Sequence, residues 1–129
     1  MIKHNLKIIA LFLFIFSIVS PGCRKEGPGG KAKVSGTVLN NGVGVSTAVL
    51  YIKYGASIDP GTDISVYDKS YKCDNKGGYS ITPLVQGNYW LYAVAQSVTT
   101  QGITQQLSGG VAINISSRKQ SLVQNIAIK

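Results

Sequence analysis

From Lys31 to the end of the chain, short runs of β-branched and aromatic residues alternate with clusters of Gly, Asn, Asp and Pro. Apolar residues nowhere in this part recur at helical spacing, and runs of this kind between turn residues are typical of a β-sandwich. We therefore predict an all-β fold, a single sandwich of about seven strands in two sheets. The strands are expected at residues 32–39, 46–54, 64–73, 79–82, 89–96, 111–116 and 122–128.

Successive side chains of a strand point to opposite faces of its sheet, so two of these runs predict which residues face the core. The inward set is Ala48, Leu50 and Ile52 together with Tyr89, Leu91, Ala93 and Ala95. The outward set is Val49, Tyr51 and Lys53 together with Trp90, Tyr92 and Val94. Because Tyr89 would carry a hydroxyl into the interior, we expect that hydroxyl to bond to the backbone, as in a tyrosine corner.

The N-terminal segment has the features of an export signal. Two lysines precede an apolar run at residues 8–19, which is short against the roughly 20 residues of an ordinary membrane-spanning helix. Residues 20–23 read Ser-Pro-Gly-Cys, which resembles the box that ends at the lipid-modified cysteine of bacterial lipoproteins. We predict that residues 1–22 form a cleaved signal helix and that lipid on Cys23 anchors the protein to a membrane of the cell envelope, with the outer membrane expected. Two alternatives stay open: ordinary cleavage that leaves a free Cys23 thiol, and an uncleaved membrane tether.

Cleavage before Cys23 would leave 107 residues, which suffices for one domain with a modest core. Residues 23–31 have no apolar side chain large enough for a core and are predicted to be a flexible tether, so the domain would span residues 32–129. The formal charge would fall from +8 to +6, with the lysines spread along the chain. Because the charge is dispersed and export removes the protein from most nucleic acid, we expect no nucleic-acid partner.

The residue types that carry common catalytic chemistry are scarce. The only histidine, His4, lies in the leader, so the mature chain would have no imidazole for a catalytic triad, a general base near neutral pH or a zinc site. We predict no enzymatic activity, no cofactor and no metal. Cys73 would have no partner if Cys23 carries lipid. It is expected to be a small buried residue, with a reactive or intermolecularly paired thiol as the alternative.

Four stretches resemble a known family: residues 34–38, 48–50, 74–81 and 84–91. In order and spacing they are similar to the carboxypeptidase regulatory-like domains, a prealbumin-like (Ig-like) sandwich related to the collagen-adhesin B-type repeats. The resemblance implies that Asp74 caps a turn, with calcium binding as the alternative. It implies no hydrolase activity, because hydrolases of similar fold use histidines. Some B-type repeats contain a Lys–Asn isopeptide bond, for which Lys33 and Asn125 are the candidates here.

Aromatic residues suggest one candidate binding surface. Trp90, Tyr92 and Tyr51 are predicted on one outward face, where flat rings would stack on sugars. The alternative is that Trp90 and Tyr92 are covered by residues 54–72 or packed inside. We expect a lipid-anchored envelope protein whose sandwich is a non-catalytic interaction or scaffolding module for an envelope protein or polysaccharide. A carbohydrate-binding module that uses Trp90, Tyr92 and Tyr51 is the alternative.

Overall fold

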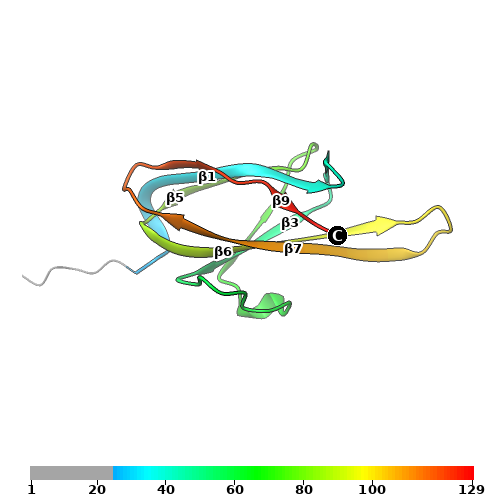
Figure 1. The fold of residues 1–129 in the computed structure, drawn as a ribbon, viewed down its shortest axis with the longest axis horizontal. Helices are drawn as coiled ribbons and strands as arrows, with labels where there is room; N and C mark the ends of the chain where they lie inside the picture. Colours follow the sequence, from blue (N-terminus) through cyan, green and yellow to red (C-terminus); the bar gives the residue numbers. More distant parts are fainter. Residues whose placement is uncertain (1–24) are drawn as a thin grey trace, which may run out of the picture.

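Two β-sheets face each other in the computed structural model, which describes residues 25–129 (Figure 1). The first sheet contains β1 (Pro28–Asn40), β2 (Val43–Gly44), β5 (Gly78–Leu84), β8 (Ser121–Val123) and β9 (Ile126–Ala127). The second contains β3 (Val49–Tyr54), β4 (Lys69–Lys72), β6 (Gly87–Val98) and β7 (Thr104–Ile115), in the order β4-β3-β6-β7. The prediction of an all-β fold with two sheets is confirmed. The predicted signal helix and Cys23 lie outside the described residues.

β1 is the central strand of the first sheet. β5 runs antiparallel along one edge of β1, and β8 and β9 run parallel along the other edge. The chain after β9 joins the two sheets, because the main-chain N–H of Lys129 donates to the C=O of Ser108 in β7 (3.2 Å) and the N–H of Ser108 donates back (3.1 Å). The first sheet is therefore assembled from the two ends of the domain and its middle.

The core lies between the sheets and follows the predicted alternation. Every residue of the predicted inward set is at most 3% exposed. They pack with apolar residues of the first sheet and the residue just after it: Ala32, Val34, Val38, Ile81, Ile126 and Ile128. The Tyr89 hydroxyl donates to the C=O of Val85 (2.6 Å) and accepts from the N–H of Gly27 (2.9 Å), so the expected bond to the backbone is confirmed.

The domain begins earlier than the predicted boundary at Ala32. Besides the bond from Gly27 to Tyr89, the N–H of Val85 donates to the C=O of Gly27 (2.9 Å), and β1 starts at Pro28. The second half of the predicted tether is thus part of the first sheet. Glycines there hide the strand in the sequence, and Gly30 is needed because a Cβ at this position would lie 1.9 Å from the C=O oxygen of Leu84.

The segment between β3 and β4 also differs from prediction. Residues Ile64–Val66, expected to begin a strand, form a 3-10 helix whose N-cap is Asp63. The carboxylate of Asp63 accepts from the N–H of Ser65 (2.9 Å), which favours a tight turn over an extended chain. The strand itself, β4, begins only at Lys69. With β2 added and the last predicted strand divided into β8 and β9, the described residues contain nine strands rather than about seven.

The hairpin of β6 and β7 is much longer than predicted. Its strands pair from Gly87↔Ile115 to Val98↔Thr104, whereas the predicted strands stopped at residue 96 and resumed at residue 111. β3 stops pairing with β6 at Val49↔Val94, so the hairpin continues beyond it. In Figure 1 the hairpin tip (yellow) projects from the end of the sandwich opposite to the end where the described part of the chain begins (blue). Within residues 25–129, none of the helical segments has the length and apolar character needed to cross a membrane.

Candidate functional site

The outer face of the second sheet carries the residues predicted to bind a ligand. β3 and β6 are antiparallel with Tyr51 opposite Tyr92 and Lys53 opposite Trp90, so the predicted outward set shares one face. Trp90 and Tyr51 are half-buried. Tyr92, in contrast, is only 5% exposed, so the prediction that its ring lies open at the surface was wrong.

A tyrosine from the segment between β3 and β4 covers Tyr92. The Tyr67 ring stacks on Tyr92 with centroids 5.5 Å apart and an interplanar angle of 18°. Tyr51 completes the cluster, at 6.0 Å from Tyr67 and 6.4 Å from Tyr92. Tyr67 is itself buried at 9% exposure, and burial, assisted by the nearby Asp59 charge, raises its pKa to about 12. The alternative prediction, that residues 54–72 cover this part of the face, holds for Tyr92.

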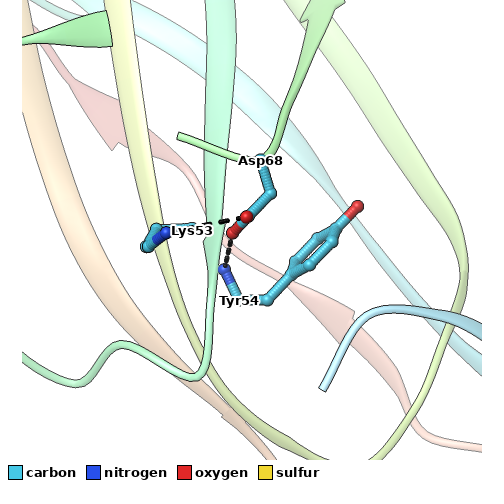
Figure 2. Close-up of polar contacts among 3 residues, drawn as sticks. All are labelled: Lys53, Tyr54 and Asp68. Carbon is cyan, nitrogen blue, oxygen red and sulfur yellow. Dashed lines mark hydrogen bonds and ion pairs between the residues drawn. The ribbon is translucent and has the colours of Figure 1, made fainter. Parts of the chain in front are cut away.

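Polar contacts fasten one end of this covering segment to β3 and brace its interior. Figure 2 shows the Asp68 carboxylate between two groups of β3: it accepts from the N–H of Tyr54 (2.7 Å) and lies 3.6 Å from the ammonium of Lys53. Further out, the Tyr67 hydroxyl donates to the C=O of Gly61 (2.8 Å). The segment is therefore a fixed cover over Tyr92. Sequence reasoning missed Tyr67 because it lies in an irregular stretch, where strand alternation assigns no face.

Trp90 is held against the neighbouring strand. A Cβ added to Gly110 of β7 would lie 2.7 Å from the indole Nε1 of Trp90, so the indole edge packs where glycine leaves room. The Trp90 indole nitrogen and the Tyr92 hydroxyl are both buried, with no hydrogen-bond partner among the described residues. Neither polar group is directed to solvent, where a sugar would need it. The three aromatic residues share a face, but the structure does not arrange them as an open platform.

Next to the tyrosine cluster the face is hollowed by a groove of about 460 Å³. It lies beside β6 at the N-terminal end of β3. Its lining residues are Thr47, Val49, Tyr51, Val94, Ala95, Gln96 and Val98. Three valines give it an apolar floor. No charged residue occurs anywhere between Lys76 and Arg118, a stretch that includes all of β5, β6 and β7. The groove and the hairpin above it are therefore suited to an uncharged partner.

The end of the molecule around Asp74 is organised as a turn. One oxygen of the Asp74 carboxylate accepts from the N–H groups of Lys76 (2.8 Å) and Gly78 (2.8 Å), and these bonds lower the pKa of the carboxyl. The expected Asx-type cap is thus confirmed. Among the described residues no group of three or more His, Cys, Asp or Glu side chains gathers as metal ligands would, and the calcium alternative finds no further carboxylate here.

Cys73, next to this turn, is a free thiol that is half-buried against the core. Burial, followed by the charge of Asp74, raises the pKa of the thiol, which lowers the thiolate fraction at neutral pH. This environment agrees with the expected role as a small packed residue. The groove beside it, of about 560 Å³, is shallow and is lined mainly by the turn and by β1 and β5.

The residues considered for an isopeptide bond are not brought together. Lys33 pairs with Ser121 of β8, whereas the side-chain oxygen of Asn125 accepts from the N–H of Thr37 (3.0 Å), farther along β1. Asn125 therefore serves to hold the chain between β8 and β9 against β1.

In comparisons with known proteins, no family model matches this chain and no curated protein matches it.

Proposed function

We propose that this chain is a lipid-anchored protein of the cell envelope, in the outer membrane, whose sandwich is a non-catalytic interaction module of the carboxypeptidase regulatory-like, prealbumin-like type. The anchor is Cys23, and the binding region is the uncharged outer face of the second sheet with the β6–β7 hairpin. One observation carries the proposal: the hairpin tip and the N-terminal end of the described chain lie at opposite ends of the molecule (Figure 1). An anchor at the N-terminal end leaves the far end free to meet a partner.

The composition of the hairpin supports a binding role over a catalytic one. Val98 and Ile103 near its tip are 68% and 59% exposed, and the residues around them are Ser, Thr, Gln and Gly. Exposed aliphatic groups among uncharged polar groups favour contact with another macromolecule. Catalysis would need converging titratable groups, and between Lys76 and Arg118 the only titratable side chains are tyrosines. The sugar-binding alternative is less well supported, because Tyr92 is covered and the Trp90 indole nitrogen is buried.

The anchor is tested by comparing two alanine variants. Cys23→Ala should move the protein from the detergent phase to the aqueous phase and remove the added lipid mass from the N-terminal peptide. Cys73→Ala is the matched control and should stay in the detergent phase. A Cys23→Ala protein that still partitions with detergent, or a natural product that retains Met1, would contradict the anchor.

The binding region is tested by trimming the hairpin. The aqueous Cys23→Ala protein is added to envelope vesicles that contain the wild-type chain, and retention is measured after sedimentation. Replacing residues 96–106 with an Asn-Gly turn, which closes a two-residue hairpin on the hydrogen-bonded pair Ala95↔Leu107, should abolish retention while the sandwich stays folded. Since the hairpin is uncharged, retention should be nearly independent of salt. Retention that survives trimming, or that disappears at high salt, would refute the proposed binding region.

A further inference from the structure

The β6–β7 hairpin has an unused strand edge beside the groove. The main-chain N–H and C=O of Ser108 both bond to Lys129. The main-chain N–H and C=O groups of the even-numbered β7 residues therefore point away from β6. Gln96 lies opposite Gln106 and Val98 opposite Thr104, so Gln96 and Val98 direct their N–H and C=O groups to the β3 side. The donation from Gly55 N–H to Asn88 C=O (2.8 Å) shows the same parity at the other end of β6.

No strand of the described chain occupies this edge. Beyond Val49↔Val94 the chain leaves β6: the N–H of Val45 donates to Val38 in the first sheet (3.0 Å), and the N–H of Ala48 donates back to Val45 (3.3 Å). In the described residues the main-chain groups of Gln96 and Val98 on this side have no partner. The position that a longer β3 would fill is the groove.

The edge also lacks the features that protect strand edges. Natural edges commonly carry lysine or other charges that prevent pairing with another chain. The β4 edge of the same sheet follows this rule, with Lys69 and Lys72 at its two ends. The hairpin extends four residue pairs beyond β3 with no charge, although a two-stranded ribbon alone is only marginally stable in water. An added strand would satisfy both the open edge and the marginal ribbon.

We infer that the partner is a second copy of this chain, which adds its own β6 edge antiparallel to the first around a two-fold axis at Ser97. This names the partner of the binding region and so rests on the proposed function. In this register Gln96 of one copy faces Val98 of the other, and both residues have their free groups on that side. The interface is therefore isologous, and the two hairpins become one four-stranded sheet with the order β7-β6-β6-β7.

The groove matches the side chain that this register brings to it. Val98 of the second copy takes the place opposite Gln96, in line with β3 and next to Val49. Its side chain would enter the apolar floor formed by Val49, Val94 and Val98. Charge also permits self-pairing: the positive net charge of the chain would oppose contact between two copies, but the charge-free hairpin keeps those charges apart.

The contact is small, so the pair is a weak one that gains from the high local concentration on a membrane. Because the two copies run antiparallel, their anchored ends lie at the two far ends of the pair. The pair therefore either lies along one membrane or bridges two facing membranes.

Disulfide trapping tests the register directly in full-length mature protein in detergent micelles, where the membrane geometry does not matter. Ser97 would lie opposite Ser97 in a non-hydrogen-bonded pair, with Cα atoms about 4.5 Å apart, within reach of a disulfide. In a Cys73→Ser background, Ser97→Cys should form a disulfide-linked dimer on mild oxidation. Gln105→Cys is the matched control, since its two Cα atoms would be about 14 Å apart, three strand spacings. We expect roughly tenfold less dimer for it.

Two prolines separate the edges of the hairpin. In the Ser97→Cys background, Val98→Pro removes an N–H only from the β6 edge and should abolish trapping, whereas Gln106→Pro removes one only from the β7 edge and should leave it. Val98→Lys should also abolish trapping without any change to the main chain. No Ser97→Cys dimer, equal trapping of Gln105→Cys, or the reverse response to the two prolines would overturn the inference. If trapping fails while vesicles lacking the wild-type chain still retain the protein through the hairpin, the proposed function stands and only the partner is wrong.

Discussion

Replacing Tyr89 with Phe should lower the free energy of unfolding by about 2–3 kcal/mol, because one hydroxyl ties the start of the domain to its centre. The ring is 0% exposed and stays in place in the variant, so no cavity larger than an oxygen atom forms. The hydroxyl accepts a hydrogen bond from the N–H of Gly27 (2.9 Å) and donates one to the C=O of Val85 (2.6 Å). Each bond contributes roughly 1 kcal/mol, and the buried Gly27 N–H left without a partner adds about the same again.

The measurement is urea unfolding followed by circular dichroism, in a Cys23→Ala background that removes the lipidation site. In thermal unfolding of the same proteins, a loss of this size corresponds to a midpoint temperature lower by roughly 8–15 °C for a domain of this length. Tyr54→Phe is the matched control. The centroid of the Tyr54 ring lies 6.0 Å from that of Tyr89, but the Tyr54 hydroxyl makes no hydrogen bond within the described residues and points away from Asp68 in Figure 2. A Tyr89→Phe protein within about 0.5 kcal/mol of its parent, or an equal loss in Tyr54→Phe, would refute the reasoning.

Three further predictions concern the turn, the thiol and the tryptophan. The pKa of Asp74 is lowered below its ordinary value of 3.8 by hydrogen bonds made only in the folded state, so its contribution is present above about pH 4 and is lost as the pH falls through the folded pKa. Asp74→Asn should therefore flatten the acid side of a stability profile measured between pH 2 and 6, and an unchanged slope would count against this cap. Raised pKa and burial should make Cys73 react with iodoacetamide more slowly in the folded protein than in urea at pH 8, as followed by mass spectrometry; equal rates would show an open thiol. Gly110→Ala should displace the Trp90 indole, shift its fluorescence to longer wavelength and cost about 1–2 kcal/mol, whereas an unchanged spectrum would mean that the indole does not rest on this glycine.

The sequence predicted best where side-chain alternation was strong. In β3 and β6 the inward residues, the outward residues and the bond from Tyr89 to the backbone all followed from period-two patterning. The turn at Asp74 followed from its Asp-Asn-Lys-Gly-Gly composition, since carboxylate and glycine together specify a tight turn.

Prediction failed where tertiary contacts overrode local preference. Residues 97–110 look like a loop because they contain three glycines, which disfavour strands, and few apolar residues, yet they pair with β6 or form the hairpin tip. Glycine is required at strand position 109 because a Cβ there would lie 2.0 Å from the C=O oxygen of Ala127. This is a contact between distant parts of the chain. Tyr67 was missed for the same reason: its position over Tyr92 depends on how Asp68 fastens an irregular segment to β3.

The position of β1 has a consequence for how the chain reaches its native state. β1 is the first strand in the sequence, whereas its parallel neighbours β8 and β9 are the last. The contact order is therefore high, and folding is expected to take milliseconds to seconds rather than microseconds. In a chain threaded through a translocon from its N-terminus, the edge of β1 that pairs with β8 and β9 would stay open until the final residues emerge. Such a delay favours a protein that is kept unfolded during transport and acquires its structure only after crossing.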